Sequence, residues 1–102
     1  MSKPKRKQQT QADWIASIGE PNRLILLRAL TTGPYTVTQL AKVCDLEPHI
    51  VSKHLGVLRE AGLVTCERDG RFQCYALTGA KATAILLELT HESGIKVLIS
   101  LT

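Results

Sequence analysis

Three cysteines and three histidines are the side chains of this 102-residue chain best suited to nucleophilic or metal chemistry. Cys44, Cys66 and Cys74 are odd in number, and their spacings match no paired-cysteine metal or redox motif, which favours buried free thiols. The chain has no glycine-flanked nucleophile and little length from which to build a cleft, so we expect it not to be an enzyme. A thiol at one of these positions that responds to oxidation is a hypothesis that stays open.

Basic side chains are concentrated at the N-terminus. Lys3, Lys5, Arg6 and Lys7 supply four positive charges, which equals the formal net charge of +4, and the other nine basic residues are matched by nine acidic ones. Such a tail either contacts a polyanion or stays solvated. We therefore divide the chain into a basic flexible tail, residues 1–10, and one domain, residues 11–102.

The composition is that of a soluble globular domain, with 44% hydrophobic and 22% charged residues. No apolar run approaches the roughly 18 residues that cross a bilayer. The polar N-terminus also lacks the apolar core of a signal peptide. We expect a cytoplasmic protein without a membrane partner.

Polar and basic side chains recur along one face of the segment 48–61. Val51, Leu55 and Leu58 follow the i, i+4, i+7 spacing of a buried helical stripe. Side chains that can bond base edges and phosphates occupy the other face, namely His49, Ser52, Lys53, Gly56, Arg59 and Glu60. An ordinary solvated helix face is the alternative.

A short helix is expected before this segment and a β-hairpin after it. Thr36 and Gln39 have the spacing of a capping box, and a turn of about four residues separates the helix they open from the segment 48–61, as in a helix-turn-helix. Strand-like runs at 63–68 and 71–77 surround Asp69-Gly70, with Arg68 and Arg71 on either side of the tip. This order is typical of a winged helix, which grips duplex DNA through the groove helix and the wing.

The hairpin register decides whether its two thiols can meet. With Asp69-Gly70 as a two-residue turn, Cys66 is expected opposite Gln73. Cys74 then lies on the other face of the sheet, so a disulfide between the two cysteines would need a different register.

The remaining segments predict a mainly α domain with a small β-hairpin, in the order α-α-α-α-β-β-α. Helices are expected at 9–17 and 21–30, and a last helix at 80–90, while residues 95–101 permit a strand or a helix. The last helix is more apolar than one buried side requires, so we expect a homodimer. Its predicted interface residues are Trp14, Ile15, Ile85, Leu86 and Leu89.

The order of elements and several runs of residues resemble the ArsR/SmtB family of small bacterial repressors. The runs that carry the resemblance start at Ile18, Val51 (Val-Ser-Lys-His-Leu) and Leu58 (Leu-Arg-Glu-Ala-Gly-Leu-Val). It covers about residues 15–77. The resemblance implies a homodimeric transcription repressor that binds a palindromic operator in double-stranded DNA and leaves it when an inducer binds.

The sensing residues of that family are not matched here. Thr36 and Thr38 stand where metal-sensing members have two cysteines, and hydroxyls do not replace thiolates as soft ligands. Lys81 stands at a ligand position of the other family metal site, so His91 and Glu92 are expected on the surface. Arg28 occupies the place of the persulfide-sensing cysteine. We therefore predict no metal and no cofactor, and the inducer stays unknown.

The DNA contacts follow from the docking geometry of the motif. Ser52 and Lys53 lie mid-face and His49 lies near the helix N-terminus, where groove helices reach bases. His54 matches the family histidine but borders the apolar stripe, so it either touches DNA or orients the helix. The predicted DNA-binding residues are His49, Ser52, Lys53, His54, Arg59, Arg68 and Arg71, with Lys3, Lys5, Arg6 and Lys7 of the tail. Alternatives are a winged helix that binds protein instead of DNA, and a thiol-responsive repressor.

Overall fold

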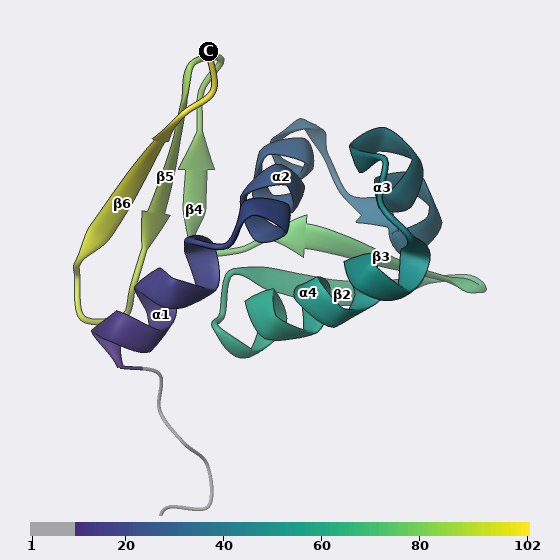
Figure 1. Ribbon diagram of the computed structural model, residues 1–102, viewed down its shortest axis with the longest axis horizontal. Coiled ribbons are helices and arrows are strands. Elements are labelled where there is room, and N and C mark those ends of the chain that lie inside the picture. Colours follow the sequence, from purple (N-terminus) through teal and green to yellow (C-terminus); the bar gives the residue numbers. More distant parts are fainter. Residues whose placement is uncertain (1–9) are drawn as a thin grey trace, which may run out of the picture.

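The computed structural model describes residues 10–102 as a winged helix-turn-helix followed by a second, C-terminal sheet (Figure 1). Lys3, Lys5, Arg6 and Lys7 lie outside the described residues. The helices are α1 (Gln11–Ile18), α2 (Pro21–Ala29), the short 3-10 helix η1 (Leu30–Thr32), α3 (Val37–Cys44) and α4 (Pro48–Glu60). The strands are β1 (Tyr35–Thr36), β2 (Val64–Asp69), β3 (Phe72–Leu77), β4 (Ala80–Ala82), β5 (Leu86–Thr90) and β6 (Lys96–Ser100).

Local signals set the ends of the helices. The capping box of α3 is present in full, because Thr36 Oγ1 accepts from the Gln39 N–H at 3.1 Å and Gln39 Oε1 accepts from the Thr36 N–H at 2.9 Å. Pro21 and Pro48 open α2 and α4, where the missing proline N–H costs nothing. Gly62 follows α4 at a φ of +77°, a left-handed conformation that glycine adopts without strain.

The wing is a three-stranded antiparallel sheet in the order β1-β3-β2. Its tip is Gly70-Arg71 rather than Asp69-Gly70, so Cys66 lies opposite Tyr75 and not Gln73. Gly70 has a φ of +65° at the first central position of the turn, the place that a type II′ turn reserves for glycine, while Asp69 stays in the strand. The pairing differs from the expected one by two residues, an even number, so Cys66 and Cys74 still lie on opposite faces.

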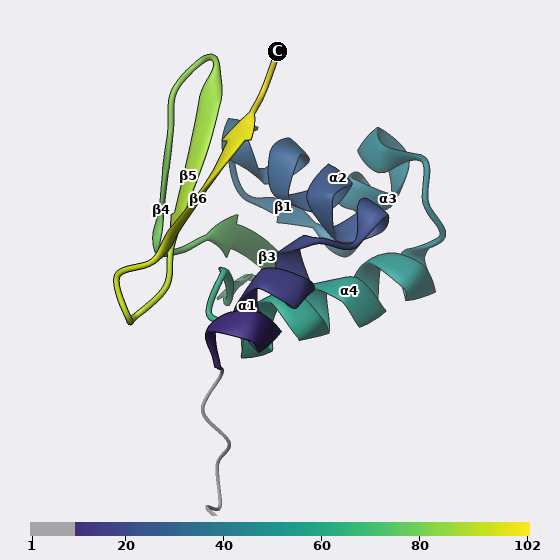
Figure 2. The ribbon, with the colours of Figure 1, turned by 60° about the vertical axis from the view of Figure 1, so that its left-hand side comes forward.

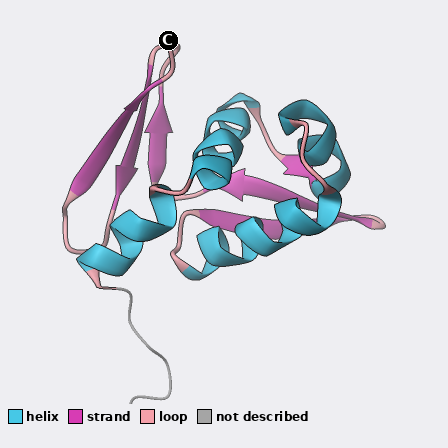
Figure 3. Ribbon diagram, in the orientation of Figure 1, coloured by secondary structure: helices cyan, strands magenta, loops and turns pink. Residues whose placement is uncertain are grey.

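The last third of the chain corrects the prediction of a helix at 80–90. An antiparallel sheet forms instead, in the order β4-β5-β6 (Figure 3). Of the two structures expected for residues 95–101, the strand is therefore the one observed. Thr83 Oγ1 accepts from the N–H groups of Ile85 and Leu86 and closes the turn between β4 and β5. Pairing then places Leu87 opposite Ile99 on one face. Leu87 and Leu89 are therefore buried on one face of a sheet and not along a helical stripe.

The apolar face of the C-terminal sheet, with Leu87, Leu89 and Ile99, belongs to the same hydrophobic core as the helices (Figure 2). Trp14 of α1 is 1% exposed. The centre of its ring lies 5.2 Å from that of His91, a residue of the turn that connects β5 to β6. Gln11 of α1 donates to Ser93 Oγ at 3.0 Å in the same turn. The sheet and the wing tip stand at opposite ends of the molecule (Figure 1). Within residues 10–102, no helix has the length and apolar character needed to cross a membrane.

Candidate nucleic-acid interface

Helix α4 has one buried and one exposed face. Val51, Leu55 and Leu58 are each 0% exposed and fix the helix against the core. The predicted contact residues His49, Ser52, Lys53 and Arg59 are all exposed. Gly56 belongs to the same open face, since a Cβ added there meets no atom within 4 Å. The face can therefore approach a groove without steric obstruction from its own chain.

The N-terminal end of α4 carries a negative charge instead of a hydroxyl cap. Glu47 is the N-cap residue, and its side chain makes no capping hydrogen bond. An acid there stabilises the helix by interacting with the positive end of the helix dipole. The same carboxylate, exposed beside the predicted base-reading residue His49, repels the phosphates of an approaching duplex.

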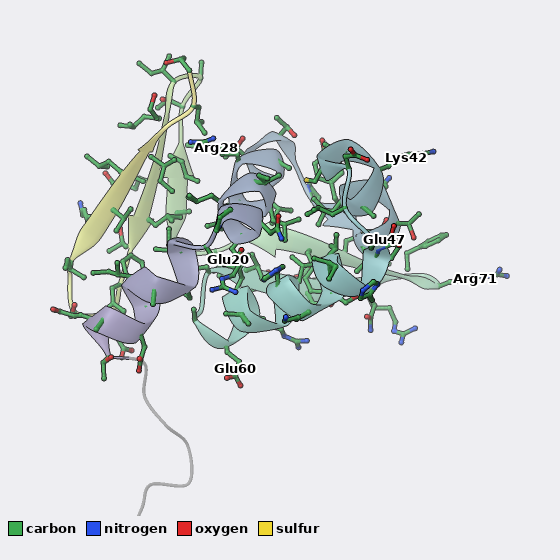
Figure 4. The ribbon with its side chains drawn as sticks, viewed as in Figure 1. Glu20, Arg28, Lys42, Glu47, Glu60 and Arg71 are labelled. Atoms are coloured by element: carbon green, nitrogen blue, oxygen red, sulfur yellow. The ribbon has the colours of Figure 1, made fainter. Side chains whose placement is uncertain are left out.

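The wing separates its basic and acidic side chains by face. Arg68 pairs with Gln73 on the side of the sheet that also carries Cys66 and Tyr75, which packs against the core. Glu67 and Asp69 lie on the other side, because successive residues of a strand point to opposite faces. Arg71 lies in the turn, at the far end of the wing (Figure 4).

Gln73 is a candidate contact that sequence reasoning missed. The expected hairpin register paired it with Cys66, whereas the observed one puts it opposite Arg68 and leaves it exposed. The signal that could have found it is the glycine of the turn, because only Gly70 needs a left-handed φ.

The charge of Arg59 on α4 acts on Tyr75 of the wing. Burial raises the pKa of the Tyr75 hydroxyl, a hydrogen bond and the charge of Cys66 raise it further, and the nearby Arg59 guanidinium opposes the rise. The exposed Arg59 of α4 therefore lies close enough to Tyr75 of β3 for its charge to act on that hydroxyl.

His54 is placed differently from the other predicted contacts. Its side chain is buried, with 6% of the residue exposed, and its Nδ1 atom lies 3.0 Å from Nη1 of Arg23. Its Nε2 atom lies 3.8 Å from Oε2 of Glu20. Because the side chain is buried beside these two partners, its placement favours orientation of the helix over contact with a base edge.

Comparison with known proteins identifies the family. Residues 20–65 match the family model "Bacterial regulatory protein, arsR family". The HTH-type transcriptional regulator NmtR of Mycobacterium tuberculosis is 37% identical over 82 residues, which cover 80% of this chain and 68% of NmtR. The chain belongs to the arsR family. Because proteins of this family are DNA-binding transcriptional regulators, this arsR-family chain is a regulator and not an enzyme.

Two further proteins are similar to this chain. The biofilm growth-associated repressor of Agrobacterium fabrum is 33% identical over 71% of this chain and 62% of the repressor. The solved homodimeric winged helix-turn-helix DNA-binding domain of a possible ArsR-family regulator from Mycobacterium bovis is 28% identical, with a TM-score of 0.64 over 67% of this chain and 63% of that one. The chain thus spans about two thirds of the length of its curated relatives.

Thr36 and Lys81 stand where the family resemblance places metal ligands. Thr36 caps α3, and Lys81 lies on β4 opposite Glu88 of β5. His91 is 8% exposed and packed on Trp14, which corrects the expectation of a surface residue, whereas Glu92 is exposed. Across residues 10–102, no three His, Cys, Asp or Glu side chains gather as a metal site would need.

The thiols of this arsR-family chain are free and separate. Cys44, Cys66 and Cys74 are all partly buried. Burial raises the pKa of the Cys44 thiol, which lowers its thiolate fraction and with it its reactivity. Because Cys66 and Cys74 point to opposite sides of the wing, they cannot form a disulfide within the hairpin.

The predicted dimer residues divide into two groups. Trp14 is 1% and Leu89 0% exposed, so both belong to the core of the protomer and their assignment to an interface is wrong. Ile15, Ile85 and Leu86 are 43%, 62% and 37% exposed. Leu98 of β6 is 59% exposed. It was not among the predicted interface residues, because a strand and a helix were both left open for residues 95–101.

Proposed function

We propose that this chain represses transcription by binding a palindromic operator as a homodimer, with α4 in the major groove and the wing on the flanking backbone. The observation that carries the proposal is that exposed donors occur on both elements of the motif. They lie on the exposed face of α4 and on the side of the wing that carries Arg68 and Gln73. Donors on a groove helix and on a wing are what a duplex requires of this motif.

The contacts divide by chemistry. His49 and Ser52 lie at the N-terminal half of α4, so we assign them to base edges. Arg59, Arg68, Arg71 and Gln73 are assigned to phosphates or to the minor groove beside the wing. Lys53 can serve either role. The tail, with Lys3, Lys5, Arg6 and Lys7, adds attraction that does not depend on sequence.

The homodimer is assigned to α1 and the C-terminal sheet. Exposed apolar side chains on these elements are Ile15, Ile85, Leu86 and Leu98, and isolated monomers seldom collect them at one end. This end lies away from the wing tip (Figure 4), so a partner there leaves α4 and the wing free for DNA. The homodimeric Mycobacterium bovis domain is consistent with such a pairing.

The inducer is proposed to act at a site other than the two familiar metal sites. Zinc, cadmium or arsenite should leave the affinity for operator unchanged within about twofold, because Thr36 and Lys81 supply neither thiolate nor imidazole. The measurement is fluorescence anisotropy of a labelled operator with and without each ion. A bound ion that releases DNA and is coordinated by Thr36 or Lys81 would contradict the assignment.

Binding to the duplex upstream of the chain's own gene tests the proposal. We expect that duplex to be retained in the presence of a large excess of random DNA. Ser52→Ala should reduce this preference, whereas Thr65→Ala, which also removes one exposed hydroxyl but on the side of the wing away from Arg68, should not. Equal affinity of the wild type for both duplexes, or none for either, would reject the repressor and favour a winged helix that binds protein.

A further inference from the structure

Gly56 lies inside α4, at a position where glycine is unfavourable. The helix runs without a break from Pro48 to Glu60 and continues for a full turn after Gly56 (Figure 3). Glycine has the lowest helix propensity after proline, because it loses the most backbone freedom on folding and adds no side-chain contact. Alanine would suit this position better if helix formation alone decided the residue.

The packing and the backbone of the domain do not explain the glycine. A Cβ atom added at Gly56 meets no neighbouring atom within 4 Å, so no other element approaches the helix at this point. The backbone of Gly56 is right-handed helical, whereas Gly62, just after the helix, has a φ of +77° that favours glycine. Any residue could therefore occupy position 56 in the free protomer.

The neighbours of Gly56 on the helix surface are residues assigned to DNA. Ser52 lies four positions earlier and Arg59 three positions later, and all three residues are exposed. Residues at these separations are adjacent on one face of a helix. Ser52 and Gly56 therefore leave the middle of this face with little side-chain bulk.

The opposite side of α4 keeps the helix in place. Leu55 and Leu58, which flank Gly56 in sequence, are both 0% exposed and belong to the hydrophobic core. A close-packed core resists displacement of its side chains. Because α4 cannot move inward to make room, any atom added at position 56 extends outward, toward whatever lies on the exposed face.

We propose that Gly56 is the point at which the backbone of α4 comes closest to the operator, and that it thereby determines specificity. This role rests on the proposed DNA binding and extends it to a residue without a side chain. A methyl group at position 56 would stand between the helix and the duplex. It would hold Ser52, one turn away, at a greater distance from its base, and hydrogen bonds weaken steeply with distance.

Stability and operator binding should respond to Gly56→Ala in opposite directions. The thermal unfolding midpoint should rise by about 2–8 °C, because alanine favours the helix and meets no obstacle in the protomer. Affinity for the operator should fall at least about fivefold, the usual penalty for one extra carbon in a tightly packed contact. A glycine that is merely solvated would give the first change without the second.

Random DNA provides an internal comparison. Binding to random DNA depends on attraction to phosphates and does not require base contacts. The loss caused by Gly56→Ala should therefore be smaller on a random duplex, so that preference for the operator falls. Because the substitution changes no charge, the slope of log affinity against log salt should stay the same on random DNA.

The experiment combines binding isotherms on operator and random duplexes with thermal unfolding of each free protein. Gly56→Leu extends the series, and its affinity for the operator should be lower than that of Gly56→Ala because its side chain is larger. Val43→Ala is the matched control. It also replaces a residue of lower helix propensity by alanine, at a side chain of α3 that is 62% exposed, and should leave operator affinity unchanged.

The outcomes separate this role of Gly56 from the proposed function. If the wild type prefers the operator and Gly56→Ala binds it equally tightly, the close approach at Gly56 is wrong and the repressor stands. If Gly56→Ala lowers the unfolding midpoint, the glycine serves the fold, which also overturns the inference. A wild type without preference for the operator rejects the proposed function itself, and the role of Gly56 with it.

Discussion

The winged helix and the C-terminal sheet differ in what determines their structure and in what they expose. In the helix-turn-helix, four helix boundaries have a local cause: a capping box at Thr36, prolines that open α2 and α4, and a glycine after α4. In the C-terminal sheet, the strands depend on one another, as when Leu87 of β5 faces Ile99 of β6. The exposed face of α4 in the first region carries donors and cations, and the outer face of the second carries Leu86 and Leu98. The two ends of one small domain are therefore suited to different partners.

The largest expected effect concerns the core of the C-terminal sheet. Leu89 is 0% exposed, so Leu89→Asp buries an unpaired charge and should destabilise the fold by at least about 3 kcal/mol. Thermal or urea unfolding followed by circular dichroism measures the loss. A variant as stable as the wild type would show that this sheet does not form in solution.

Leu86→Asp tests the exposed side of the same strand. Leu86 is 37% exposed in the protomer, so the variant should keep its unfolding midpoint but lose the dimer, because a charge at an apolar interface is costly. Sedimentation at micromolar concentration distinguishes the two species. A wild type that already sediments as a monomer contradicts the proposed interface.

These two leucines also show what sequence can and cannot predict. Three leucines within 86–89 have high helix propensity, and nothing local reveals that one faces the core and another solvent. The choice is made by pairing with β6, whose partner residues lie 8 to 14 positions further along the chain, and by the Thr83 turn. The helix-turn-helix needed no such information, because its caps and turn residues lie next to the elements that they end.

The same division applies within the DNA-facing surface. The exposed residues of α4 could be predicted, because helical spacing alone separates Val51, Leu55 and Leu58 from the polar face. The burial of His54 could not, since its partner Arg23 lies 31 residues earlier in the chain. Gln73 was missed through a register error, which arose from assigning Asp69 to the turn.

The wing should show an intermediate effect. Gln73→Ala is expected to weaken binding by about 0.5–1.5 kcal/mol, the usual net value of a hydrogen bond, with a similar loss on operator and random DNA if it meets phosphate. Thr65→Ala, on the opposite face of β2, is the matched control and should have no effect. Binding isotherms of both variants on both duplexes decide this, and equal losses for the two variants would remove Gln73 from the interface.

The smallest effect is expected for the N-cap of α4. Glu47→Ser removes a carboxylate from the DNA side and adds a hydroxyl that can cap the helix, so operator affinity should rise by a few tenths to about 1 kcal/mol. Glu60→Ser, at the other end of the same helix, serves as the control (both are labelled in Figure 4). An unchanged affinity for Glu47→Ser would place this end of α4 away from the phosphates.

A salt titration of DNA binding on two duplexes, operator and random, tests most directly whether α4 reads the sequence. Each phosphate neutralised adds about 0.9 to the slope of log affinity against log salt, so deletion of the tail should lower the slope by at most about 4 per protomer and leave the preference for operator nearly intact. His49→Ala and Ser52→Ala should leave the slope nearly unchanged and remove about 1–3 kcal/mol of preference per good contact. A tailless protein that loses its preference for operator, beside groove-helix variants that keep it, would contradict the account.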